Sequence, residues 1–123
     1  MNAALTARLV AAGRIGFGVA LIAAPERLTG PWLGRDAGRA GTRVVSRGLG
    51  ARDVALGAGA LGVPESQLRP WVLAAIVADT ADLVATVTAG DSLPLTGRLL
   101  VGAVASAGAV LGVVALVGLP SCR

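Results

Sequence analysis

Long apolar segments, separated by proline and glycine, are the feature that most restricts how this chain can fold. Four such segments cover about residues 3–24, 44–63, 70–89 and 95–118. Each has about 20 to 25 residues, and a helix of about 20 residues crosses the roughly 30 Å hydrocarbon core of a bilayer. A chain of 123 residues that is 54% hydrophobic is too short to bury this surface as a soluble domain. We therefore predict an all-α fold, a four-helix transmembrane bundle forming one integral membrane domain over residues 1–123.

The short connections predict how neighbouring helices run. Residues 65–69 join the second segment to the third, and residues 90–94 join the third to the fourth. Links of this length make the joined helices antiparallel neighbours in an up-down arrangement. Pro70 suits the first turn of the third helix, and Gly90 is a suitable C-cap at its end.

The first connection, residues 25–43, is longer and rich in glycine and arginine, and we expect it to be irregular backbone at one membrane interface. It contains Trp32, whereas Trp71 begins the third segment, so the two indoles mark opposite interfaces. Five arginines on the side of the first connection oppose three on the other side: Arg27, Arg35, Arg39, Arg43 and Arg98 against Arg8, Arg69 and Arg123. This imbalance favours a cytoplasmic first connection with both termini outside.

Ionisable residues fall near the middle of three of the four segments. The midpoints lie at Gly13–Arg14, at Arg52–Asp53 and near Asp79, while the fourth places Ser106 there. A charged residue at the centre of a membrane helix costs about 2.5–3.5 kcal/mol, so the second segment should not insert stably alone. We therefore expect these charges to meet at one depth and to neutralise one another.

Three arginines and three aspartates form the candidate binding site or charge network: Arg14, Arg47, Arg52, Asp53, Asp79 and Asp82. Asp79 and Asp82 are three residues apart and share one helix face, with Thr86 further along the same stripe. They are the candidate reactive carboxylates, and Arg14 and Arg52 would hold them ionised or clamp an anionic group. The alternative is a purely structural ion-pair lattice that fixes helix packing.

Several classes of function are disfavoured. The net charge of +4 does not indicate nucleic-acid binding, because the arginines are spread among apolar runs without aromatic partners. With no histidine and with Cys122 as the single cysteine, we expect no disulfide, metal or other cofactor, and we assign no catalytic residue. The apolar run 11–24 is interrupted by Arg14 and followed by Pro25, so we do not expect it to be a cleaved signal peptide.

Three short stretches carry a family resemblance: Gly13-Arg14 through Ala24-Pro25-Glu26, then Gly50-Ala51-Arg52-Asp53, then the Asp79-x-x-Asp82 pair. They resemble small four-span membrane proteins of actinobacteria that carry a domain-of-unknown-function label and are related in layout to the DoxX-like group. The resemblance covers nearly the whole chain and implies the four-span fold. Some DoxX-like proteins are similar to quinone-linked redox subunits, but this chain has no cofactor ligand on which to carry that property over.

These observations favour a multi-pass plasma-membrane protein with a non-enzymatic role, acting as a binding or accessory subunit. The alternative is a small proton- or solute-coupled carrier that uses Asp79 and Asp82, and an enzyme acting on a lipid or quinone head group ranks third. The lipid bilayer is the expected partner. A homo-oligomer or a larger membrane complex is left open.

Overall fold

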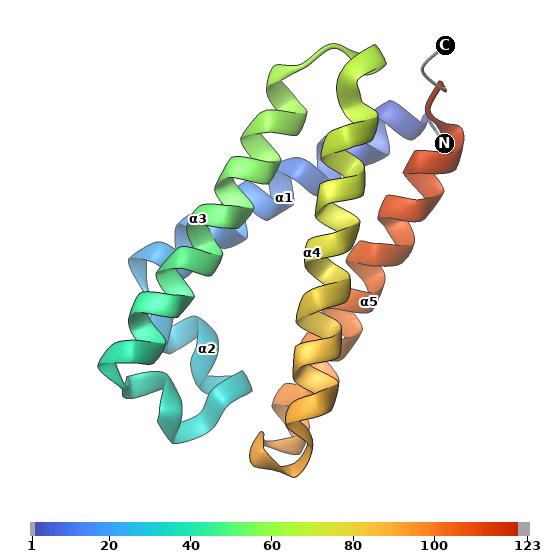
Figure 1. Ribbon diagram of the computed structural model, residues 1–123. Coiled ribbons are helices and arrows are strands. Elements are labelled where there is room, and N and C mark those ends of the chain that lie inside the picture. Colours follow the sequence, from blue (N-terminus) through green and yellow to red (C-terminus); the bar gives the residue numbers. More distant parts are fainter. Residues whose placement is uncertain (1, 121–123) are drawn as a thin grey trace.

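The computed structural model describes residues 2–120, which are almost entirely helical and contain no strand (Figure 1). The described residues form five α-helices and three short 3-10 turns. They are α1 (Ala3–Ala23), α2 (Pro25–Leu33), α3 (Ala40–Gly62), α4 (Leu68–Ala89) and α5 (Leu95–Gly118). The turns are η1 (Gly34–Gly38), η2 (Glu65–Gln67) and η3 (Gly90–Ser92). The predicted all-α class is confirmed.

The four long helices follow the four apolar segments closely. The Asn2 side chain caps the start of α1 by accepting hydrogen bonds from the backbone N–H groups of Ala4 and Leu5. Helix α3 begins four residues earlier than predicted and α4 two residues earlier. Gly90 ends α4 with φ of 53°, a conformation that glycine adopts without strain, so this predicted C-cap is confirmed.

Helix α2 was not predicted and occupies part of the connection that was expected to be irregular. Pro25, which was expected to end the first helix, also begins α2, because proline is well suited to the first helical position. Gly34 ends α2 with φ of 62° and packs against Pro94. The described residues therefore contain five α-helices instead of the expected four.

Three helical segments are long and apolar enough to cross a membrane: Ala3–Ala23, Glu65–Ser92 and Leu95–Gly118. Helix α3 has a similar length of 23 residues but is not among them. Its charged residues, including Arg52 and Asp53, account for this difference, in line with the expectation that it would not insert alone.

Helices α1 and α3 pack as an antiparallel pair along a seam of small residues. The buried seam positions follow the three- and four-residue spacing of a heptad. They are Ala4, Ala7, Ala11, Gly18 and Leu21 on α1, with Arg14 at the position between Ala11 and Gly18, and Ser46, Gly50, Asp53, Gly57 and Ala60 on α3. A Cβ atom built on Gly57 would lie 2.5 Å from the carbonyl oxygen of Ala11. Small residues thus bring the two backbones together, as expected for helices that associate in lipid.

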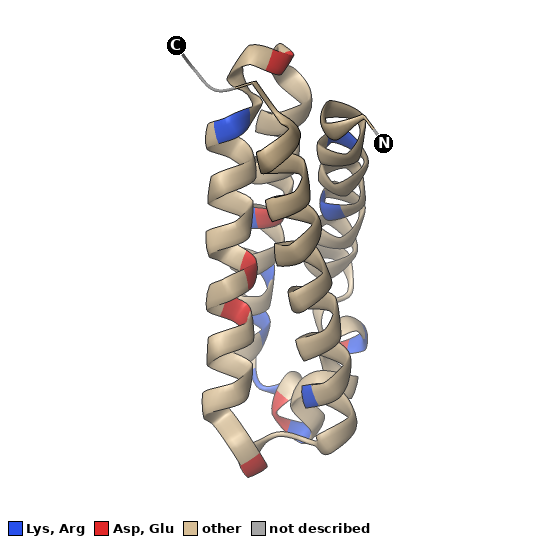
Figure 2. Cartoon of the chain, turned by 90° about the vertical axis from the view of Figure 1, so that its right-hand side faces the viewer, with Lys and Arg blue, Asp and Glu red and all other residues tan. Residues whose placement is uncertain are grey.

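Helices α4 and α5 form the second antiparallel pair, again through glycine. Gly108 lies against the carboxylate of Asp79, and Gly112 lies against Ile76. The two helix pairs meet in an apolar core at the end of the bundle that holds both ends of the described chain. Helix α2 lies at the opposite end (Figure 1). That core includes Ala4 and Leu68. Charged residues occur both at the helix ends and part-way along the helices (Figure 2).

Candidate binding site beside an ion-pair chain

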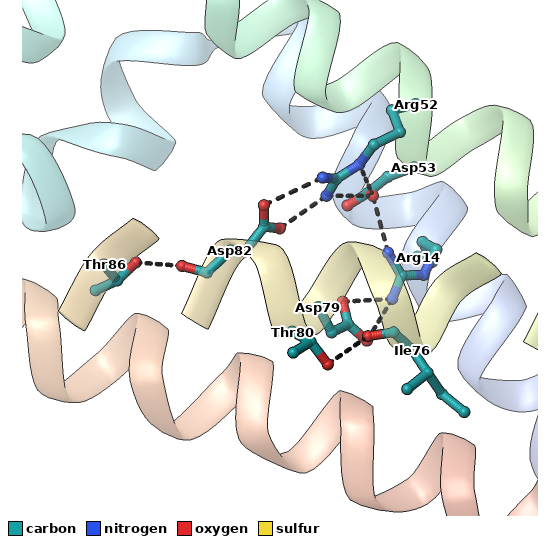
Figure 3. A network of polar contacts seen from close by, with 8 residues as sticks. All are labelled: Arg14, Arg52, Asp53, Ile76, Asp79, Thr80, Asp82 and Thr86. Atoms are coloured by element: carbon teal, nitrogen blue, oxygen red, sulfur yellow. Dashed lines mark hydrogen bonds and ion pairs between the residues drawn. The ribbon is translucent and has the colours of Figure 1, made fainter. Parts of the chain in front are cut away.

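Five charged residues from three helices form one continuous chain of ion pairs (Figure 3). Its order is Asp82, Arg52, Asp53, Arg14 and Asp79, so acidic and basic groups alternate. Arg52 donates to the two carboxylate oxygens of Asp82 at 3.1 and 2.7 Å. One oxygen of Asp53 accepts from Arg52 at 3.1 Å and from Arg14 at 2.9 Å. Nη2 of Arg14 lies 2.6 Å from both oxygens of Asp79.

The chain is buried at one end and partly exposed at the other. The side chains of Arg14, Asp53 and Asp79 are 8, 7 and 12% exposed, whereas those of Arg52 and Asp82 are 31 and 25% exposed. Burial of a charge is tolerated only when partners replace its lost hydration. The three most buried groups have such partners, because Arg14 contacts both Asp53 and Asp79.

The small-residue seam explains how Arg14 and Asp53 reach each other. Arg14 lies between Ala11 and Gly18 on α1, and Asp53 lies between Gly50 and Gly57 on α3, at heptad spacing in both helices. Close approach of the two backbones therefore brings the guanidinium and the carboxylate into contact. Arg14 also contacts Asp79, so charged residues from three helices meet here.

Helix α4 presents both of its aspartates to the other helix pair. Asp79 reaches α1, and Asp82 reaches α3. Thr86 lies on the same stripe, as expected, but its hydroxyl donates to the backbone carbonyl of Asp82 at 2.8 Å and not to a carboxylate. Such intrahelical bonds satisfy a hydroxyl in an apolar environment without extending the ion-pair chain.

Arg47 is the one candidate residue that the structure places outside the chain. Its Nε donates to the backbone carbonyl of Ile22, near the C-terminus of α1, at 3.3 Å. Arg8 makes the reciprocal contact and donates to the carbonyls of Leu61 and Val63, at the C-terminus of α3. A cation at a helix C-terminus is favourable because the last carbonyls lack intrahelical partners.

The second helix pair, α4 and α5, has the same kind of contact between an arginine and the end of a neighbouring helix. Arg69, at the start of α4, donates to the carbonyls of Leu116 and Leu119 at the end of α5, at 2.9 and 3.2 Å. In the sequence, Arg8 and Arg69 served only as indicators of membrane orientation. Their positions within a turn or two of helix ends, beside an antiparallel neighbour, were the signal for this capping role.

A cavity of about 410 Å³ lies beside the ion-pair chain. Four charged residues form part of its wall: Arg14, Asp53, Asp79 and Asp82. Most of the remaining lining is apolar and comes from α1, α2, α3 and α5, with Phe17 and Trp32 as its aromatic members. The indole N–H of Trp32 is buried without a hydrogen-bond partner. No sequence pattern predicted this cavity.

A second, smaller cavity of about 30 Å³ lies on the other side of the chain's buried end. Arg14 and Asp79 line both cavities, and the small one extends toward Trp71 and Ala115. Its volume is sufficient for about one water molecule. The Arg14–Asp79 ion pair thus lies between the cavity of about 410 Å³ and the cavity of about 30 Å³.

No protein-family model, curated protein or solved structure matches this chain. The resemblance to small four-span membrane proteins therefore remains a prediction that rests on the residues quoted for it.

Proposed function

We propose that this chain is a multi-pass plasma-membrane protein in which all four long helices cross the bilayer, and that it is a non-enzymatic binding or accessory subunit. It holds a small, largely apolar molecule in the cavity beside the ion-pair chain. One observation carries this proposal: the cavity and the chain share a wall formed by Arg14, Asp53, Asp79 and Asp82.

The pairing of charges on α3 supports its role as a fourth span. Arg52 and Asp53 are neutralised by partners on α1 and α4, and Arg47 contacts a backbone carbonyl near the end of α1. These contacts offset the insertion cost of about 2.5–3.5 kcal/mol for each charge at a helix centre. In this proposal, α3 crosses the bilayer as a member of the bundle and not as an independent segment.

The character of the cavity supports ligand binding over a purely structural lattice. Small-molecule sites usually enclose about 300–1,000 Å³ and combine an apolar lining with a few polar groups. The cavity of about 410 Å³ fits this description. Ion pairs that served only to fix helix register would require no cavity beside them. The unpartnered indole N–H of Trp32 is a further group that a ligand could satisfy.

Native mass spectrometry of the protein in lipid nanodiscs tests this proposal. We expect a small molecule to copurify with the wild-type protein and to be lost from Val101→Phe, because Val101 lines the cavity. Val113→Phe is the matched control, since Val113 is an exposed valine on the same helix. Equal retention by both variants, or no bound molecule after extraction in native lipid, would contradict the proposal.

A small proton- or solute-coupled carrier is the second candidate. The position of the Arg14–Asp79 pair between two cavities favours it, because breaking this pair would connect them. Asp79→Asn combined with Asp82→Asn in proteoliposomes should then abolish a pH-dependent flux while the protein assembles normally. A variant that assembles and keeps the flux would exclude a carrier role for these carboxylates.

A further inference from the structure

The ion-pair chain contains one more acidic group than basic groups. Among the described residues it joins Asp53, Asp79 and Asp82 to Arg14 and Arg52. Arg47, which would have balanced it, is engaged with the carbonyl of Ile22. When all five groups are ionised, the chain therefore carries a net charge of −1.

Other charged residues of the surrounding helices do not supply the missing positive charge. Arg8 on α1 and Arg69 on α4 donate to carbonyls at helix ends. Arg98 on α5 pairs with Asp91, and Arg43 at the start of α3 pairs with Glu26 of α2. Arg39 pairs with Asp36, and Arg27 and Arg35 are exposed and do not line the cavity. The excess negative charge thus remains local to the middle of the bundle.

This excess faces the large cavity. All three aspartates of the chain line that cavity, but only one of its two arginines, Arg14, does so. An uncompensated charge in a low-dielectric environment is costly, and either one proton or one cationic ligand can remove that cost. Phe17 and Trp32 line the same cavity, and aromatic rings attract cations over their faces.

We propose that the molecule held in this cavity is a lipophilic monovalent cation, such as an amine or quaternary ammonium group on an apolar body. Its positive charge balances the chain, and its body occupies the apolar part of the cavity. This proposal rests on the proposed binding function and specifies the ligand class. Because a proton can restore the same balance, the cation and the proton compete for the site.

Two ions of closely similar shape and opposite charge provide the test: tetraphenylphosphonium and tetraphenylborate. Trp32 lines the cavity and reports their binding by fluorescence in a Trp71→Phe background, where it is the single tryptophan. Measurements in nanodiscs, with empty nanodiscs as the blank, should show saturable binding of the cation at least about tenfold tighter than of the anion. The affinity for the cation should fall as the pH is lowered.

Asp82→Asn tests whether the excess charge selects the ligand. It leaves two aspartates and two arginines in the chain, and the amide oxygen can still accept from Arg52, so we expect a folded protein that has lost the preference for the cation. Asp91→Asn is the control, because Asp91 has a side chain that is 99% exposed and lies outside the cavity. Size-exclusion chromatography and circular dichroism establish that both variants fold.

The outcomes separate the two proposals. Stronger binding of the anion, or binding without charge preference, would overturn the cationic ligand class but leave the cavity as a binding site. An unchanged cation preference in folded Asp82→Asn would also overturn it. Failure of the wild-type protein to bind either ion would overturn the cationic class as well. The binding function itself is tested separately by native mass spectrometry, where no bound molecule, or equal retention by Val101→Phe and Val113→Phe, would contradict it.

Discussion

Gly18 of α1 and Gly50 of α3 face each other so closely that a Cβ atom on either would meet the backbone of the other. The built Cβ of Gly18 lies 2.5 Å from the carbonyl oxygen of Gly50, and that of Gly50 lies 2.6 Å from the carbonyl oxygen of Gly18. Backbone atoms cannot move aside as a flexible side chain can. This contact therefore sets the distance between the two helices that carry Arg14 and Asp53.

Alanine at either glycine should destabilise the protein. Overpacking of this kind costs about 1–3 kcal/mol, and we expect Gly18→Ala and Gly50→Ala to lower the thermal midpoint in detergent. Gly16→Ala and Gly48→Ala are matched controls, because a Cβ at these positions meets nothing within 4 Å. The controls should be neutral or stabilising, since alanine favours helix by up to about 1 kcal/mol over glycine. Equal effects in the two sets would contradict the close approach of α1 and α3.

Asp53 should be the least replaceable member of the ion-pair chain. Its carboxylate contacts both Arg14 and Arg52, so Asp53→Ala removes one partner from the buried Arg14 and one from the partly exposed Arg52. Removing one partner of a buried ion pair costs about 3–5 kcal/mol. We expect loss of the monodisperse peak in size-exclusion chromatography. Asp91→Ala, at an exposed position, should leave the peak unchanged, and a similarly intact Asp53→Ala would show that the chain adds little to stability.

Substitution of Arg52 should destabilise the protein more than substitution of Arg47, although the two residues are only five positions apart. Arg47→Gln removes a single contact to the carbonyl of Ile22, for which we expect at most about 1 kcal/mol. Arg52→Gln removes ion pairs with Asp53 and Asp82 and should cost several times more. Thermal unfolding of the two variants in the same detergent measures the ranking. The reverse ranking would contradict the assignment of Arg47 to helix capping.

The proposed four-span topology places the two ends of α3 on opposite sides of the membrane. In a Cys122→Ser background, Arg35→Cys and Glu65→Cys introduce thiols at exposed positions in the turns before and after α3. A membrane-impermeant maleimide added to intact cells should label Glu65→Cys and spare Arg35→Cys until the cells are lysed. Labelling of both thiols in intact cells would mean that α3 does not span. The opposite pattern would keep the span and reverse the orientation.

The long helices could be predicted because their boundaries depend on local chemistry. Proline and glycine end the apolar segments, and Gly90 adopts the positive φ expected of a C-cap. The meeting of Arg14, Asp53 and Asp79 could also be predicted, because a common depth follows from helix length alone. Helix α2 was missed because its glycine and proline content resembles that of a loop, although Pro25 at its first position was a recognisable start.

The hydrogen-bond partners of the arginines on α3 could not be predicted from the pattern of apolar segments. Arg47 and Arg52 both lie in the apolar segment that forms α3, and their different partners depend on how α1 and α4 pack around it. The heptad spacing of small residues on α1 and α3 was present in the sequence and would have predicted that these two helices pair. The cavity could not have been anticipated, because it is a space left between helix pairs and no residue type marks it.

The sequence positions of the residues in the ion-pair chain also determine when each partner becomes available during synthesis. During synthesis Arg14 emerges 39 residues before Asp53 and 65 residues before Asp79, and Arg52 emerges 30 residues before Asp82. A nascent chain that inserts as it is made therefore carries Arg14 before either of its acidic partners exists, and Arg52 with Asp53 but not yet Asp82. In the proposed four-span topology, the partner of Arg52 on α4 is therefore made only after α3 is complete. A polypeptide truncated before Asp82 would leave Arg52 with Asp53 as its remaining partner in the ion-pair chain.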